Sequence, residues 1–225
     1  MKRNWWKILC VVLFLYAVIY GLSIEVPDLN RLHQTVRNLF YHVPLWFGMI
    51  FILLISFIYS IRYLSSGKEE HDIVAIEAVK VGLLFGVLGF ITGSFWGNYS
   101  WGELSAWLTS EPRSLASMIA MLFYVAYIIL RGSLEEVTKR AKISAVYNVF
   151  AFVLYLLFII VVPRLTESLH PGAGGNPGFN IYDSDNNLKV VLYPAWLAYM
   201  LLALWITNIL VRAKKIELKT LTNDI

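Results

Sequence analysis

Tryptophan is concentrated in one short stretch of this sequence. Three tryptophans and a tyrosine fall between positions 96 and 107, interrupted by glycines: Trp96, Tyr99, Trp101 and Trp107. Tryptophan commonly anchors helices at the level of the lipid headgroups, which explains Trp46 and Trp196 adequately. Three indoles in a glycine-containing loop also form a broad, flat apolar surface suited to a large planar ligand. The pattern alone favours the two interpretations about equally.

The four histidines are the other side chains that could do chemistry. His71 lies among charged residues and is typical of a solvated loop, whereas His33 lies in an apolar pattern where packed histidines are common. His42 and His170 lie in the segments that precede and follow the tryptophan stretch. Either histidine alone is more often a hydrogen-bonded residue at the membrane interface. Because imidazole is the commonest metal ligand in proteins, two of them beside one aromatic surface favour a ligand that contains a metal.

Composition indicates the kind of protein that must position these residues. Of 225 residues, 58% are hydrophobic and 15% are charged, and the mean hydropathy is +0.63, whereas soluble domains carry roughly 25% charged residues. A soluble enzyme and a disordered chain are thereby excluded, and an integral membrane protein is predicted. The basic residues behind the net charge of +4 are scattered between apolar runs, which argues for a lipid bilayer and against a nucleic-acid partner.

Six apolar stretches are long enough to cross a bilayer as helices, which takes about 20 residues each. They lie near 5–22, 43–63, 78–96, 114–130, 143–162 and 190–211. We therefore expect an all-α membrane protein with a single six-helix domain over residues 1–225. Lys80 is tolerated in the third stretch because Glu77 precedes it by three residues and a lysine can extend toward the headgroups.

The segment before the second stretch has a helical pattern of its own. Apolar residues recur at helical spacing within 23–42, and Asp28 is placed as an N-cap. This pattern predicts a short helix lying on the membrane surface. Pro44 suits the first turn of the membrane helix that follows.

The distribution of basic residues predicts the orientation. Of the 19 Lys and Arg residues, 14 fall on one side of the six stretches, which the positive-inside rule makes the cytoplasmic side, together with both termini. The outer side then receives residues 23–42, 97–113 and 163–189. His42, His170 and the tryptophan stretch are thus expected to meet at the outer face.

Zinc and haem are the two ligands to weigh for such a site. Zinc needs three or four protein ligands, but the outer segments offer only scattered carboxylates and no His-x-x-x-His spacing. Haem needs one or two axial imidazoles, an apolar surface for the porphyrin and cations for its propionates. The outer segments supply all three, and the available cations are Arg37, Arg113 and Arg164.

Enzymatic chemistry has little support in the sequence. The glycine-rich run at 172–178 lacks the Lys-Ser/Thr ending of a phosphate loop. No Ser-His-Asp arrangement and no paired carboxylates within one helix are visible. The residues therefore show no recognisable catalytic arrangement, and binding is favoured over catalysis without excluding an enzyme.

These features resemble the CcmC family, the haem-handling membrane subunit of cytochrome c maturation, within the wider WWD-domain haem-handling superfamily. The matching segments are Tyr41-His42-Val43-Pro44, Thr92-Gly93-Ser94-Phe95-Trp96-Gly97, Trp101-Gly102 and Leu169-His170-Pro171-Gly172. Length and helix number match as well, so the resemblance covers essentially the whole chain. The family's signature usually ends in a tryptophan pair, Asp, Pro and a basic residue, and here Glu111-Pro112-Arg113 stands a few residues further on.

The resemblance implies a function and a site. Haem b would be held transiently at the outer face of the inner membrane, with His42 and His170 as axial ligands of the iron. The other haem-binding residues would be Trp96, Trp101, Trp107 and Arg113. Haem would pass to a periplasmic chaperone of the CcmE type, and further partners would be a small single-helix subunit of the CcmD type and ABC-transporter subunits of the CcmA and CcmB types.

Three other functions remain to be weighed. A permease subunit of an ABC-type exporter, for haem or a small solute, needs polar groups inside the bilayer, and Asn148 and Asn208 are candidates. A membrane anchor with a permanent haem b needs histidines well inside the helices. A structural scaffold leaves the outer histidines and tryptophans unexplained.

Overall fold

The computed structural model describes residues 4–27, 33–166 and 186–223, and the regular structure in these ranges is helical throughout. Within them, six helices are long and apolar enough to cross a membrane, which confirms the predicted all-α, multi-pass membrane fold. These are α1 (Trp5–Ser23), α2 (Leu39–Ser66), α3 (Glu69–Trp101), α5 (Pro112–Gly132), α6 (Val137–Leu156) and α8 (Asn186–Asn223). The shorter described elements are η1 (His33–Asn38), α4 (Leu104–Ser110), the π-helical turn η2 (Leu157–Val161) and α7 (Val162–Leu165).

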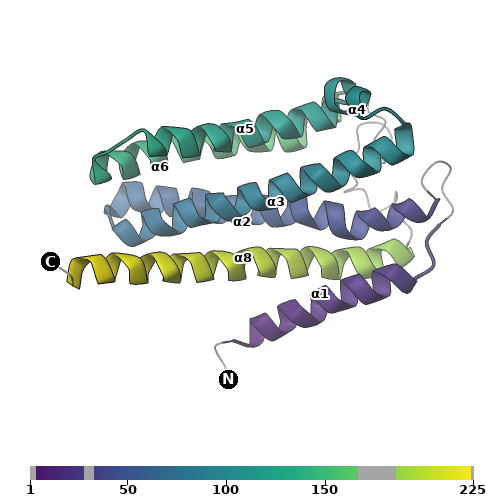
Figure 1. The fold of residues 1–225 in the computed structure, drawn as a ribbon, viewed down its shortest axis with the longest axis horizontal. Helices are drawn as coiled ribbons and strands as arrows, with labels where there is room; N and C mark the ends of the chain where they lie inside the picture. Colours follow the sequence, from purple (N-terminus) through teal and green to yellow (C-terminus); the bar gives the residue numbers. More distant parts are fainter. Residues whose placement is uncertain (1–3, 28–32, 167–185, 224–225) are drawn as a thin grey trace.

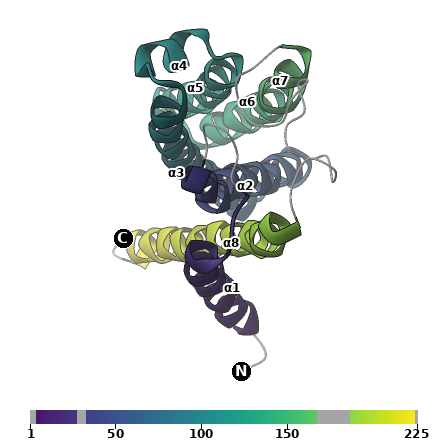
Figure 2. The same cartoon turned by 90° about the vertical axis from the view of Figure 1, so that its right-hand side faces the viewer.

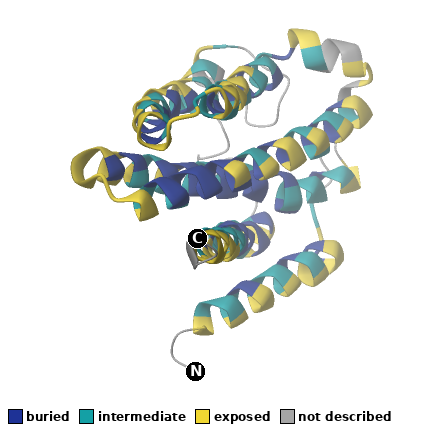
Figure 3. Cartoon of the chain, turned by 60° about the vertical axis from the view of Figure 1, so that its left-hand side comes forward, coloured by how far each residue is buried: buried dark blue, intermediate teal, exposed yellow. Residues whose placement is uncertain are grey.

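The long helices are stacked in three layers (Figure 1). Seen from one end, α5 and α6 form one outer layer, α2 and α3 the middle layer and α8 the other outer layer, with α1 on the far side of α8 (Figure 2). Helix α1 packs mainly on α8, and much of its surface is exposed (Figure 3). An apolar surface of this kind suits contact with lipid.

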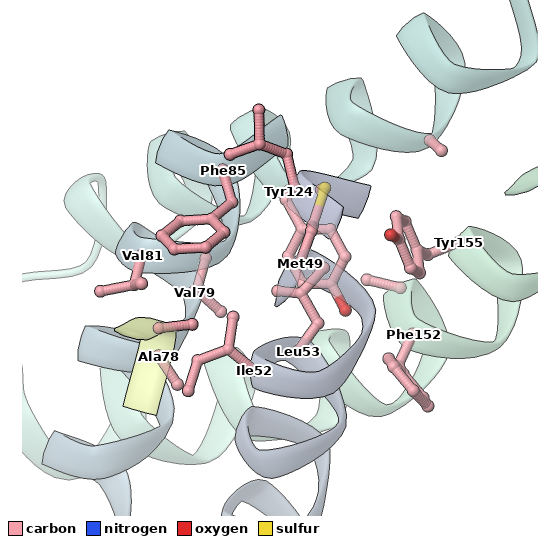
Figure 4. Close-up of a cluster of buried hydrophobic side chains, with 14 of the residues drawn as sticks. Met49, Ile52, Leu53, Ala78, Val79, Val81, Phe85, Tyr124, Phe152 and Tyr155 are labelled. Carbon is pink, nitrogen blue, oxygen red and sulfur yellow. The ribbon is translucent and has the colours of Figure 1, made fainter. Parts of the chain in front are cut away.

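Two clusters of buried side chains hold the layers together. The larger one lies where the middle layer meets α5, α6 and α8, and Met49, Phe85 and Tyr155 belong to it (Figure 4). The second cluster joins α1, η1, the start of α2, the end of α3 and the start of α8, and it includes Phe40 and Trp96. This second cluster builds the end of the bundle that carries His42, which we call the His42 end.

Glycines of α3 let the two middle helices approach closely. Each of four glycines faces one α2 side chain, in the pairs Gly93 with His42, Gly89 with Trp46, Gly86 with Met49 and Gly82 with Leu53. The intervals of four, three and four residues keep each set on one side of its helix. A Cβ atom at any of these glycines would lie only 2.5–3.1 Å from the facing side chain, so small residues are required at this interface.

Ion pairs lie toward the opposite end of the bundle. The guanidinium of Arg131 donates to both carboxylate oxygens of Asp72 at 2.7 and 2.5 Å, which ties the end of α5 to the start of α3. Lys80 donates to Glu77 at 2.7 Å, and its side chain remains 51% exposed. The expected pairing of Lys80 with Glu77 is confirmed.

The prediction for the start of the second membrane helix is wrong. Helix α2 begins at Leu39 rather than at residue 43, and Pro44 lies inside it rather than in its first turn. Residues 33–38 form η1, which continues directly into α2, instead of a separate helix on the surface. The reason is burial, because Val36 and Phe40 pack into the second cluster with α1 and α8. Asp28, the expected N-cap, lies outside the described residues.

The tryptophan stretch is helical rather than a loop. Helix α3 continues to Trp101, and α4 follows after Gly102 and Glu103. The break falls at Gly102 because its φ of +101° is a conformation that residues with a Cβ rarely adopt. The end of α3 and α4 lie at the same end of the bundle as the α1–α2 connection and the start of α8 (Figure 1). The described parts of the three predicted outer segments therefore share one end.

Candidate functional site

His42 is buried near the start of α2, with 7% of its surface exposed. Its ring centroid lies 6.3 Å from that of Trp46, one turn further along α2, and 6.2 Å from that of Trp96 on α3. Gly93 lies against the third side, because a Cβ placed there would be 2.5 Å from Cε1 of the imidazole. Two indoles and the backbone of α3 thus enclose the ring.

Thr92 links the imidazole to the backbone of α3. Nδ1 of His42 lies 3.2 Å from Oγ1 of Thr92. The same Oγ1 lies 2.9 Å from the carbonyl oxygen of Leu88 and 3.0 Å from that of Gly89, within its own helix. The hydroxyl therefore stands in a fixed position between the imidazole and two helical carbonyls.

Trp96 is packed inside the His42 end rather than spread over its surface. Its side chain is 5% exposed, and its Nε1 donates to Oγ1 of Thr35 at 3.1 Å. Because Thr35 belongs to η1, this hydrogen bond fastens η1 to α3. Trp96 therefore packs against His42 inside the bundle.

A hollow of about 440 Å³ lies between η1 and the end of α3, a size within the range of about 300–1,000 Å³ typical of small-molecule sites. Mostly polar side chains from η1 and α2 line one wall: Gln34, Thr35, Arg37, Asn38 and Tyr41. The other wall is mostly aromatic and comes from α3: Thr92, Phe95, Trp96 and Tyr99. Phe95 and Tyr99 are 75% and 74% exposed, so the exposed aromatic surface belongs to them.

Of the three candidate cations, Arg37 lies in this hollow. Its Nη1 donates to the carbonyl oxygen of Gly21 at 2.8 Å and its Nε donates to Oε1 of Gln34 at 3.0 Å, which fixes the guanidinium against the end of α1. Arg113 does not line the hollow. It follows Pro112 at the start of α5, where Glu111 caps the helix by accepting from the backbone N–H of Arg113 at 3.5 Å.

The structure describes part of the predicted set. His42 and Trp96 are brought together, and Arg113 lies at the start of α5. Trp101 ends α3 and Trp107 lies in α4, but their side chains, like that of Arg164, lie outside the described part of the chain. His170 also lies outside the described residues.

Sequence reasoning missed the residues that hold His42 in place. In the sequence, Thr92 and Gly93 stand out only as part of a segment that matches the family, and the position of Trp46 is typical of a headgroup anchor. A signal was nevertheless present, since the glycines of α3 recur at the same four- and three-residue intervals as the α2 residues that they face. A one-sided row of glycines in a membrane helix indicates a close helix contact.

The fold and the site define a class of protein. It is a multi-pass helical membrane protein with an enclosed histidine, exposed aromatic rings and a cation gathered at one end of the bundle. Residues 2–224 match the family described as heme exporter protein C, CcmC, and the chain belongs to this family. The resemblance inferred from the sequence is thereby confirmed.

Individual relatives have related names. The chain is 28% identical over 171 residues to heme exporter protein C of Paracoccus denitrificans, an alignment that covers 76% of this chain and 68% of the relative. It is 25% identical over 168 residues to heme exporter protein C of Rhodobacter capsulatus, covering 75% and 68%. It is also 32% identical over 105 residues to the cytochrome c biogenesis protein CcsA of a Prochlorococcus marinus strain, covering 47% and 32%.

Proposed function

We propose that this protein binds haem b at the outer face of the inner membrane and passes it to a periplasmic chaperone of the CcmE type during cytochrome c maturation. The observation that carries the proposal is the imidazole of His42, enclosed by two indoles beside a hollow that holds exposed aromatic rings and Arg37. Membership of the heme exporter protein C family supports the same ligand.

Haem is the cargo in this proposal, and each residue type has a distinct task. His42 and His170 provide the two axial nitrogens. Trp101 and Trp107, on α3 and α4, provide apolar contacts to the porphyrin. Arg37, which lies in the hollow, pairs with a propionate, because guanidinium groups bind carboxylates in a bidentate manner. Arg113 is the second cation of the site.

A site at the ends of helices suits transient binding. Phe95 and Tyr99 leave one side of the hollow exposed, so cargo held there remains within reach of a second protein. A histidine pair buried in mid-bilayer would instead retain haem permanently. We propose the CcmE-type chaperone as acceptor, with CcmD-type and CcmA/CcmB-type subunits as membrane partners in an ABC-transporter complex.

The polar groups within the bundle favour this function over a permease. Nδ2 of Asn148 donates to Oγ of Ser56 at 2.7 Å and to Oγ of Ser60 at 2.8 Å, and the Asn148 side chain is fully buried. Asn208 donates to the carbonyl oxygen of Leu204 in its own helix. Asn148 therefore joins α6 to α2, and Asn208 is exposed rather than inside the bundle.

The axial assignment is tested with the full-length protein purified from haem-replete cells. We expect a visible haem spectrum for the wild type, and a loss or shift of its bands for His42→Ala and for His170→Ala, with haem quantified by pyridine haemochromogen. His71→Ala is the matched control, because His71 contacts Ser66 at the opposite end of the bundle. Equal haem content in all four proteins would refute the axial assignment.

Delivery is tested separately by mixing the haem-loaded protein with a purified CcmE-type chaperone. We expect haem to leave the spectrum of the membrane protein and to appear covalently attached to the chaperone on a denaturing gel. Retention of all haem by the membrane protein, with its ABC-transporter partners and ATP present, would refute delivery to the chaperone.

A further inference from the structure

We infer that Thr92 and Gly93 are positioning residues that hold His42 as the tautomer with its hydrogen on Nδ1, so that Nε2 is the atom offered to iron. The inference rests on the proposed function, because it specifies how the proposed axial ligand is prepared. It concerns groups that the haem-binding assignments above do not include.

The argument begins with the hydrogens around Oγ1 of Thr92. Three electronegative atoms surround this oxygen: the carbonyl oxygens of Leu88 and Gly89 at 2.9 and 3.0 Å, and Nδ1 of His42 at 3.2 Å. Carbonyl oxygens only accept hydrogen bonds, and a threonine hydroxyl has a single hydrogen. We assign that hydrogen to a carbonyl, because a threonine hydroxyl within a helix commonly donates back to the carbonyl one turn earlier and both carbonyl oxygens lie closer to it than Nδ1 does.

This assignment sets the direction of the remaining contact. Because the hydroxyl hydrogen is donated to a carbonyl, Oγ1 of Thr92 can only accept a hydrogen bond from His42. The donor is then the N–H at Nδ1 of the imidazole. A neutral imidazole carries one N–H, and its second nitrogen carries the lone pair. The lone pair is therefore on Nε2.

Gly93 supplies the second constraint on the ring. A Cβ at this position would lie 2.5 Å from Cε1, 3.2 Å from Nδ1 and 3.3 Å from Nε2 of His42, so the imidazole rests on the α3 backbone itself. Trp46 and Trp96 limit its movement on other sides. A ring rotated by half a turn would bring a carbon to Thr92 and lose the hydrogen bond.

Adjacent residues of one helical turn thus provide both constraints. Thr92 supplies the acceptor and Gly93 the surface on which the ring lies. Metal-binding histidines generally donate their second N–H to such an acceptor, which orients the ring and makes the ligating nitrogen more basic. A more basic ligand stabilises oxidised iron and lowers its reduction potential.

The test compares Thr92→Val with Thr92→Ser in the full-length protein. Valine keeps the shape of threonine but removes the acceptor, whereas serine keeps the hydroxyl. We expect Thr92→Val to release haem to apomyoglobin about tenfold faster than the wild type, since loss of such partners costs roughly 10- to 100-fold in affinity. We also expect its haem reduction potential to rise, and Thr92→Ser to behave as the wild type in both measurements.

The tautomer itself is read by solid-state NMR of the wild-type protein labelled with 15N-histidine, without haem. A His42→Gln variant assigns the His42 signals among those of the four histidines. We expect the signal of a protonated Nδ1 and an unprotonated Nε2. A protonated Nε2 would overturn the inference, whatever the folding behaviour of the Thr92 variants.

The outcomes separate this inference from the proposed function. If His42→Ala loses haem while Thr92→Val has the release rate and potential of the wild type, the positioning role is refuted and the axial ligand stands. If His42→Ala keeps the haem spectrum of the wild type, the proposed axial ligand is refuted instead. A faster release in both Thr92→Val and Thr92→Ser, with unchanged potentials, would indicate a packing effect and would also overturn the inference.

Discussion

His42 owes its position to the surface of α3 that it faces. Its own helix begins at Leu39, three residues before it, and the contacts that hold the ring come largely from α3. Gly93 and Thr92 reduce this freedom, one by steric contact and the other by a hydrogen bond. If His42 is the axial ligand proposed above, a ring held in this way needs less reorganisation to bind the iron, which is the advantage of a preorganised site.

Replacement of Gly93 by alanine is expected to displace His42, the proposed axial ligand. In Gly93→Ala, the new Cβ would lie 2.5 Å from Cε1 of His42, so the imidazole must move. We expect haem content after purification to fall about tenfold, as when a supporting partner of a metal ligand is lost. Absorbance of the purified protein and pyridine haemochromogen measure the change.

Gly86→Ala is the matched control on the same face of α3. Its Cβ would meet the sulfur of Met49 at 2.7 Å and that of Met121 at 2.9 Å, and flexible methionines yield more readily than a ring. We expect a modest loss of thermal stability and unchanged haem content. An equal loss of haem in both variants would mean that Gly93 acts through helix packing alone.

At the scale of elements, helix existence was predictable and helix ends were not. Length and apolarity sufficed for six membrane helices because a bilayer demands both. The same criterion places a helix end where the apolar stretch ends, but α3 continues beyond it to Trp101 and α8 to Asn223. The start of α2 depended on the burial of Val36 and Phe40 against distant helices, and the partners of His42 depended on the register between α2 and α3. The register between two helices and the burial of a side chain against distant helices cannot be read from the sequence of one segment.

The ion pair between α3 and α5 is expected to stabilise the opposite end of the bundle. Asp72→Asn leaves Arg131 without its charged partner, and both side chains are largely buried, with 10% and 14% exposed. We expect a loss of about 3 kcal/mol of unfolding free energy, in the range for broken buried pairs. Thermal unfolding in detergent measures it against Glu217→Gln, which breaks an exposed pair with Lys214 and should cost about 0.5 kcal/mol or less.

The polar contact between α6 and α2 offers a test at the same scale. Asn148→Leu removes two hydrogen bonds to Ser56 and Ser60, and interhelical hydrogen bonds in membranes contribute about 1 kcal/mol. We expect a small decrease in thermal stability and an unchanged haem content. A large loss of haem transfer in a stably folded Asn148→Leu protein would instead favour a path through the bundle, and with it a permease.

At the scale of the whole molecule, the bundle has two chemically different ends. The His42 end holds the hollow, the aromatic side chains and Arg37, whereas Asp72, Arg131 and the α2–α3 connection lie toward the opposite end. The positive-inside rule predicts that this opposite end faces the cytoplasm. The proposed transfer to a periplasmic chaperone requires the same orientation, because haem must leave from the His42 end.

Cysteine labelling tests that orientation, and the chain is well suited to it because Cys10 is its single cysteine. In a Cys10→Ser background, serine can replace the thiol that contacts the carbonyl oxygen of Ala198 at 3.5 Å. Glu103→Cys marks the His42 end and Ser65→Cys the opposite end, and both positions are exposed. We expect a membrane-impermeant maleimide to label Glu103→Cys in cells whose outer membrane alone is permeabilised, and Ser65→Cys only after the inner membrane is opened. The reverse pattern would place His42 on the cytoplasmic side, and delivery of haem to a periplasmic chaperone would then need a separate route across the membrane.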